Sequence, residues 1–279
     1  MTTNDASLDF GAGGRLKGVV SMPESGVESD AAVVFVSAGF TSRNGPYRIY
    51  AEMARRLGAL GVPSIRFDLG GIGNSQTLHP AKPLEERTCE DIHDAIDAVL
   101  NLTGLSRVVV GGLCSGGEDA LLYAERDDRV AGVFLVDPHA YRTAGWYFRN
   151  VFSRLFFNRI VYKCLRVTKL VRIAPSCGRK SEVEGFEGDL IDYQWMERSR
   201  VRRILSQLMA RGTRVHYIYT GGRVDDFNHR RQFFRMFDGI RFNDLATVDW
   251  IPHIEHLQMY AEDRAVLYDV LQKRLGGAY

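Results

Sequence analysis

Residues 108–117 read VVVGGLCSGG, and this stretch decides the fold that the sequence predicts. The three valines are typical of a buried strand, and a turn and a helical segment follow without a break. Such a strand-to-helix turn requires small residues two before and two after its tip, because the backbone is crowded there. With Cys114 at the tip both are glycines, Gly112 and Gly116, whereas with Ser115 at the tip one is a leucine. A turn of this kind can hold a catalytic nucleophile at its tip, and the positions of the glycines favour Cys114 over Ser115 for that role.

Short apolar runs alternate with helical spacing on both sides of this turn. The expected strands cover residues 31–37, 62–68, 107–111, 130–136, 215–220 and 246–251. The expected helices cover residues 47–60, 88–100, 116–125 and 260–274. This alternation predicts an α/β protein with an open, mostly parallel sheet and helices on both faces.

One long segment interrupts the alternation. Between about residues 141 and 209 no strand is expected, and apolar residues beginning at Phe148 follow one helical face. Because this segment stands between two core strands, we interpret it as an insertion. We therefore expect residues 1–139 and 210–279 to form the core and residues 140–209 to form a helical cap.

Two further segments carry a resemblance to a known family. FDLGGIGNS, at residues 67–75, resembles the D-x-x-G-x-G-x-S loop of the α/β-hydrolase superfamily. SAGF, at residues 37–40, stands where that superfamily has its His-Gly oxyanion loop, with Ala38 in place of the histidine. The cysteine in the GLCSGG turn resembles that of dienelactone hydrolases, and together with residues 37–75 it resembles the cysteine-type hydrolases associated with exosortase and exopolysaccharide systems.

The resemblance implies an α/β-hydrolase fold with the chain order nucleophile, acid, histidine. Asp225 is the first candidate acid, because it has the family's G-x-x-D spacing from Gly222 after a predicted strand; Asp226 is the alternative. Both could instead be solvated acids that cap the next helix. His256, preceded by an acidic residue and followed by the last helix, is preferred over His253 as the catalytic histidine.

In this fold the oxyanion hole consists of the backbone N–H after the nucleophile and one N–H from an early loop. Here these belong to Ser115 and, by the resemblance, Phe40. Asp68 and Ser75 are expected to fix their own loop rather than take part in chemistry. The residue types indicate acyl transfer through a thioester bond on Cys114, with His256 moving the proton.

The preferred function is therefore cleavage of an acyl thioester by a thioesterase-like enzyme. An acyltransferase or cyclase, which passes the acyl group to an amine, thiol or hydroxyl, remains open, as does a carboxylesterase or lactone hydrolase. In a non-catalytic binding scaffold, Cys114 would be an inert cysteine in an ordinary glycine turn. The presence of an elbow, an acid and a late histidine in the correct order favours an enzyme.

Charge and cysteine content limit the partners. The net charge is +2, no run of about 18 apolar residues predicts a membrane span, and residues 1–10 do not resemble a secretion signal. The four cysteines form no C-x-x-C pair, so no metal or other cofactor is expected, and reduced thiols fit a cytoplasmic protein.

Residues 139–180 hold ten basic residues and no acid, interleaved with aromatics. This pattern suggests contact with an acidic acyl carrier protein, with coenzyme A or with a membrane surface, rather than with nucleic acid. A solvated helix face would give the same pattern. The basic residues are Arg142, Arg149, Arg154, Arg159, Lys163, Arg166, Lys169, Arg172, Arg179 and Lys180.

Overall fold

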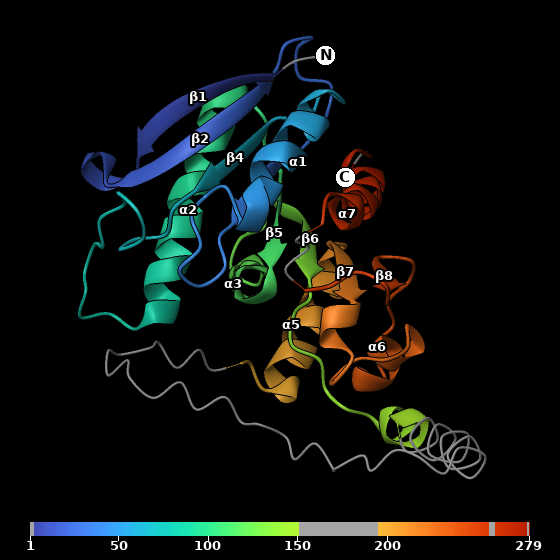
Figure 1. Ribbon diagram of the computed structural model, residues 1–279. Coiled ribbons are helices and arrows are strands. Elements are labelled where there is room, and N and C mark those ends of the chain that lie inside the picture. Colours follow the sequence, from blue (N-terminus) through green and yellow to red (C-terminus); the bar gives the residue numbers. More distant parts are fainter. Residues whose placement is uncertain (1–2, 151–194, 257–259, 278) are drawn as a thin grey trace, which may run out of the picture.

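The computed structural model describes residues 3–150, 195–256, 260–277 and 279, and in this part of the chain eight strands form one sheet (Figure 1). The strands are β1 (Thr3–Phe10), β2 (Leu16–Pro23), β3 (Ala32–Val36), β4 (Ser64–Phe67), β5 (Val108–Leu113), β6 (Val130–Val136), β7 (Arg214–Thr220) and β8 (Ala246–Ile251). Their order is β1-β2-β4-β3-β5-β6-β7-β8. The two pairings of β2, with β1 and with β4, are antiparallel and the other five are parallel, so the predicted, mostly parallel sheet is confirmed.

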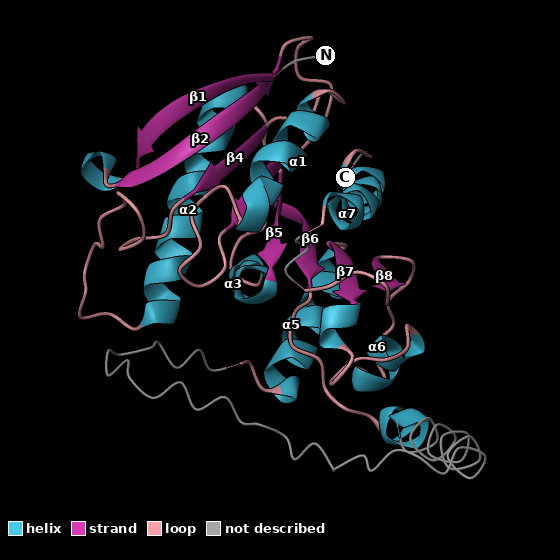
Figure 2. Ribbon diagram, viewed as in Figure 1, coloured by secondary structure: helices cyan, strands magenta, loops and turns pink. Residues whose placement is uncertain are grey.

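Helices cover both faces of the sheet (Figure 2). They are α1 (Ile49–Gly58), α2 (Leu84–Thr103), α3 (Cys114–Ala124), α5 (Arg198–Arg211), α6 (Arg231–Met236) and α7 (Ala261–Leu275). Apolar residues of α1 and α7 share one buried cluster with the sheet, and those of α2, α3, α5 and α6 share the other. Burial of apolar surface on both faces stabilises this three-layer arrangement.

The central strands form where the sequence predicts them, because parallel strands covered on both faces must be apolar throughout. All five residues of β3 and all six of β5 are buried. The β1–β2 hairpin was not predicted from the sequence. Most of β1 is exposed, and polar contacts attach it to the sheet: Arg66 forms an ion pair of 3.0 Å with Asp5, and Ser21 donates a hydrogen bond of 2.6 Å to the same carboxylate.

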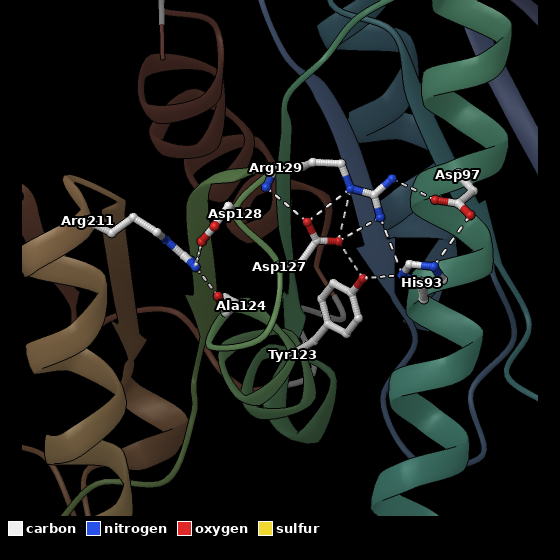
Figure 3. A network of polar contacts seen from close by, with 8 residues as sticks. All are labelled: His93, Asp97, Tyr123, Ala124, Asp127, Asp128, Arg129 and Arg211. Carbon is white, nitrogen blue, oxygen red and sulfur yellow. Dashed lines mark hydrogen bonds and ion pairs between the residues drawn. The ribbon is translucent and has the colours of Figure 1, made fainter.

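A polar network fixes the far end of α3 (Figure 3). Arg129, immediately before β6, forms ion pairs with Asp97 of α2 at 2.6 Å and with Asp127 at 2.7 Å. Tyr123 of α3 donates a hydrogen bond of 2.6 Å to Asp127. Arg211 of α5 donates to the carbonyl of Ala124. These contacts join α2, α3, α5 and β6, and they hold the helix that begins at Cys114.

The described residues of the predicted cap include several that are buried. Residues 144–150 are helical, and residues 151–194, which include most of the predicted cap, lie outside the described residues. Helix α5 falls within the range predicted for the cap, yet it packs beside α3 and contributes the fully buried residues Ile204 and Leu208 to the core. The assignment of residues 140–209 to a separate cap therefore stays a prediction.

Candidate active site

Cys114 occupies the turn between β5 and α3. Its φ of 51° lies in the left-handed region, which is costly for a residue with a side chain. A Cβ on either Gly112 or Gly116 would overlap the carbonyl oxygen of Val36. The two flanking glycines are therefore required by the close approach of β3, which is the crowding assumed in the sequence analysis. The Ser115 hydroxyl, in contrast, is buried and accepts a hydrogen bond of 3.0 Å from the Gly39 N–H.

His256 lies in the loop that follows β8, and the structure brings it to Cys114. Its Nδ1 is 2.8 Å from Asp137 Oδ2, which leaves Nε2 for the sulfur. The hydrogen bond to Asp137, and secondly the one with Cys114, raise the pKa of His256 to about 9, although burial acts in the opposite direction. The imidazolium form is thus strongly favoured when both partners are in place.

The carboxylate paired with His256 is Asp137, not the predicted Asp225. Asp137 follows the last residue of β6, has a φ of 52° and is completely buried. The backbone N–H and the hydroxyl of Thr220 each donate to it at 2.6 Å. The N–H donates to Oδ1 and the hydroxyl to Oδ2, and Oδ2 also accepts the imidazole N–H, so the buried carboxylate has three donors. The order of the three residues, Cys114, Asp137 and His256, still follows the family pattern.

The sheet sets the spacing of two of these groups. Leu113 and Val136 are paired in register on adjacent parallel strands. Cys114 and Asp137 each follow one member of this pair, so both emerge at the carboxyl edge of the sheet, one strand apart. The signal for Asp137 in the sequence was therefore an aspartate immediately after a predicted strand, at the same edge of the sheet as Cys114.

The other candidate acids and the second histidine do not contact His256. Asp225 is exposed, and its carbonyl accepts a hydrogen bond of 3.0 Å from Arg142. Asp226 forms ion pairs of 3.2 Å with Arg142 and with Arg223. His253 is exposed in the turn after β8.

The glycine pair that suggested Asp225 has a different structural role. A Cβ on Gly222 would overlap the backbone and Cβ of His256, and a Cβ on Gly221 would overlap the Pro252 carbonyl. The Gly221 N–H also donates a hydrogen bond of 2.8 Å to the Ile254 carbonyl. These two glycines therefore allow the histidine loop to pack directly on the end of β7.

The two residues expected to form the oxyanion hole both lie beside the cavity of Cys114. Ser115 is in the first turn of α3, where backbone N–H groups and the helix dipole favour negative charge, and Phe40 belongs to the loop after β3. Both line the same cavity as Cys114. Gly39 has a φ of 50°, so the loop uses a conformation that suits glycine.

Asp68 and Ser75 connect their loop to neighbouring segments, Asp68 to the loop after β3 and Ser75 to the start of β2. Asp68 accepts hydrogen bonds from the backbone and the guanidinium of Arg43. Ser75 donates a hydrogen bond of 2.8 Å to the Asp68 carbonyl and accepts one of 2.9 Å from the Lys17 N–H.

A cavity of about 810 Å³ opens in front of Cys114. Its size is that of a pocket for a small organic molecule. One side is apolar, with Leu69, Ile72 and Leu122 among the lining residues. Another side carries the buried carboxyl of Glu118, which was not identified from the sequence although it follows Cys114 by four residues, one helical turn.

Two of the ten basic residues in the predicted cap lie in the described part of the chain, and both contact the loop after β7. Arg142 pairs with Asp226 and stacks on Trp146, while Arg149 donates a hydrogen bond of 2.8 Å to Asn228. The other eight lie outside the described residues. Across the described ranges we find no group of three or more His, Cys, Asp or Glu side chains suited to a metal ion. Nor is any helix in these ranges long and apolar enough to cross a membrane.

Comparison with known proteins places this site in a familiar fold. The model of the alpha/beta hydrolase fold family matches residues 31–176. No curated protein matches the chain. An alpha-beta serine hydrolase homologue from Coxiella burnetii is 13% identical, with a TM-score of 0.56 over 99% of this chain and 98% of that one.

Two further solved structures are similar over almost their whole length. A cold-adapted esterase from an Arctic intertidal metagenomic library is 16% identical, with a TM-score of 0.52 over 98% of this chain and 93% of that one. An α/β serine hydrolase without a lid from Xanthomonas campestris is also 16% identical, with a TM-score of 0.53 over 97% and 92%. At these identities the similarity shows a shared fold, which agrees with the fold predicted from the sequence.

Proposed function

This chain belongs to the α/β-hydrolase fold family, and we propose that it cleaves acyl thioesters through a covalent intermediate on Cys114. The observation that carries the proposal is the contact of Cys114 with His256, whose Nδ1 is held by the buried Asp137. Nucleophile, base and orienting acid thus occupy the roles of a catalytic triad beside a cavity. We further propose that the chain is of the cysteine-nucleophile type that its GLCSGG turn resembles, including the hydrolases associated with exosortase systems.

The chemistry follows from these positions. His256 takes the proton of the thiol, and the thiolate attacks the acyl carbon, so that a C–S bond forms and the carbonyl oxygen becomes an oxyanion. The N–H groups of Ser115 and Phe40 would stabilise this oxyanion. Its collapse breaks the bond to the leaving thiolate, which receives the proton from His256. Water then attacks the thioester on Cys114 and gives a proton to His256, and collapse of the second adduct releases the carboxylic acid and restores the thiol.

The leaving group decides between a thioester and an oxygen ester. An alkoxide is a much poorer leaving group than a thiolate, so the adduct of Cys114 with an unactivated oxygen ester mostly returns to starting material by expelling Cys114. With a thioester both sulfurs leave with similar ease, and acylation proceeds. This argument favours a thioester substrate over the esterase and lactone hydrolase alternatives.

Acylation can be observed directly by intact-protein mass spectrometry. We expect the protein to gain the acyl mass when mixed with a medium-chain acyl thioester, and to gain it more slowly with the matched oxygen ester. Cys114→Ala should show no adduct, whereas Ser115→Ala should retain most of the reaction because it keeps the backbone N–H. An adduct that persists in Cys114→Ala and disappears in Ser115→Ala would move the nucleophile to Ser115.

Two additions extend the same experiment. An amine or thiol acceptor in the mixture separates hydrolysis from acyl transfer, since transfer yields an acylated acceptor in place of the free acid. A protein that forms no adduct with any ester or thioester would support the scaffold alternative. Iodoacetamide should modify Cys114 faster than Cys89, because Cys89 is buried and burial raises its pKa to about 11.

Few of the described residues bear on the proposed cellular location and partner. A thiol nucleophile works only while it is reduced, which supports the cytoplasmic location that we propose. An acidic carrier protein, coenzyme A or a membrane surface is proposed to contact the basic residues between residues 139 and 180. Arg142 and Arg149 do not support this proposal, because they contact the loop after β7.

A further inference from the structure

Glu118 is a buried carboxyl on the helix of the proposed nucleophile. It lies one turn after Cys114 on α3, its exposed fraction is 4%, and it lines the cavity. Burial of a carboxylate is unfavourable unless donors or positive charge compensate for the lost water. The proposed acyl-transfer steps do not use this group, so its position beside the cavity requires another explanation.

The contacts of Glu118 join three parts of the site. Its Oε1 accepts a hydrogen bond of 2.8 Å from the His139 N–H, two residues after Asp137. Its Oε2 accepts a longer one of 3.5 Å from the Met196 N–H, and Met196 lines the cavity. The same carboxylate therefore connects the helix of Cys114 with the loop of the acid and with one wall of the cavity.

The segment after Asp137 and the segment of Met196 also contact each other directly. The His139 ring stacks on Trp195 at 5.4 Å, and the Tyr141 hydroxyl donates a hydrogen bond of 2.5 Å to the Met196 carbonyl. Trp195 and Met196 both line the cavity. A movement of the Met196 backbone would thus change both the cavity and the segment that continues from Asp137.

The surroundings of Glu118 contain little positive charge. Among the described residues it forms no ion pair, and Arg223 is the one charged side chain that stabilises its ionised form, through a longer-range attraction. The other titratable groups that interact with its charge are Tyr141 and, from β7, Tyr217 and Tyr219, whereas His139 contacts it through the backbone N–H. Burial is the largest influence and raises the pKa of Glu118 to about 7, although the two backbone N–H groups lower it.

We propose that Glu118 is a positioning residue: its carboxylate holds the 137–139 loop and the Trp195–Met196 wall in place for Cys114, and its protonation releases the wall. A carboxylate can accept both N–H groups, whereas a protonated carboxyl has one oxygen that donates. The longer bond, to Met196, is the one expected to be lost. The expected change in KM rests on the proposed function. The expected change in the alkylation rate of Cys114 can be measured without turnover.

The test compares the protein with Glu118→Gln and with Glu125→Gln. Glutamine imitates the protonated carboxyl, because its oxygen can accept from His139 while its NH₂ group opposes the Met196 N–H. Glu125 follows the last residue of the same helix, pairs with Arg203 at 3.5 Å and does not line the cavity, so it provides a matched control. The readouts are KM and kcat for an acyl thioester, and the rate of Cys114 alkylation by iodoacetamide, between pH 5.5 and 9.

We expect Glu118→Gln to raise KM about tenfold at pH 8, the loss that corresponds to one hydrogen bond to a charged acceptor, with a smaller effect on kcat. For the unaltered protein and for Glu125→Gln we expect an inflection near pH 7 in the alkylation rate. This inflection should be absent from Glu118→Gln. Because the raised pKa means that ionised Glu118 is unfavourable in the folded state, Glu118→Gln should unfold at no lower temperature than the protein at pH 8. This separates a positioning role from a purely structural one.

The inference is overturned if Glu118→Gln keeps both the KM and the pH profile of alkylation of the protein. If no thioester is turned over, the proposed function fails, and the alkylation profile alone decides the role of Glu118. A Glu118→Gln variant that loses activity only because it unfolds below the assay temperature would also contradict the expected stability.

Discussion

Asp137→Asn should separate the acid found in the structure from the one expected from the sequence. Asp137 accepts two hydrogen bonds from Thr220 and one from His256, and it has no access to solvent. An asparagine there has one acceptor oxygen. If that oxygen faces the Thr220 N–H, the NH₂ group faces Nδ1 of His256 and requires it to accept. The proton then lies on Nε2, which can no longer take the proton of Cys114.

The size of the effect follows from the pKa of His256. Its rise from 6.5 to about 9, caused chiefly by Asp137, corresponds to about 3 kcal/mol of preference for the imidazolium. The ring is 33% exposed, and allowance for solvent screening reduces this figure to about 2 kcal/mol. Loss of this preference slows the reaction about 30-fold. The wrong tautomer adds to it, so that a total loss of up to about 10⁴-fold in kcat is expected, as for triads in general.

The assay is kcat/KM on an acyl thioester for Asp137→Asn, Asp225→Asn and Asp226→Asn, with thermal unfolding as a check on folding. We expect the first variant to lose between about 30-fold and 10⁴-fold. Asp225 is exposed and away from His256, so its variant should remain within about twofold, the range of a neutral surface change. The reasoning is refuted if Asp225→Asn is the inactive variant and Asp137→Asn is not.

Two other predictions concern His256. Gly222→Ala should lower kcat/KM at least about tenfold and slow alkylation of Cys114, because a Cβ there overlaps the backbone of His256. Gly277→Ala, where a Cβ meets open space, is the control and should have no effect. Equal activity of the two variants would contradict this packing. The raised pKa of His256 means that its contribution to stability is fully present below pH 6.5 and is lost as the pH rises through about 9. The free energy of unfolding should therefore fall by about 1 to 2 kcal/mol over this window, after allowance for the exposure of the ring. In denaturant titrations at several pH values, His256→Gln should remove this fall. If the unfolding free energy of the variant falls equally with pH, other groups cause the change.

The central sheet could be predicted from the sequence because burial on both faces leaves a simple pattern. Strands β3 and β5 are continuous apolar runs, and β6 and β8 have the predicted bounds. The β1–β2 hairpin leaves no such pattern. Its outer strand is polar and exposed, and it depends on contacts such as that of Asp5 with Arg66, which come from residues distant in the sequence.

The candidate site was predictable only in part, for a physical reason. The crowding at Gly112 and Gly116 leaves a local signature in the sequence, and His256 follows the last strand. The position of the acid leaves no comparable signature, because any aspartate at the carboxyl edge of a neighbouring strand can reach the imidazole. Gly222 has the G-x-x-D spacing from Asp225, but a glycine is needed there because His256 packs against it. The spacing therefore does not identify Asp225 as the acid, and His256 pairs with Asp137.

The placement of the acid after β6 decides which residues near His256 are free to vary. Cys114 and Asp137 take their separation from paired rungs of the sheet, so only His256 depends on a loop for its place. The carboxylates of Asp225 and Asp226, in the turn that follows β7, are therefore not needed to orient the imidazole. Substitution of Asp225 or Asp226, unlike substitution of the preceding Gly221 and Gly222, should leave the packing of His256 unchanged, which makes these two positions a natural place for divergence among relatives.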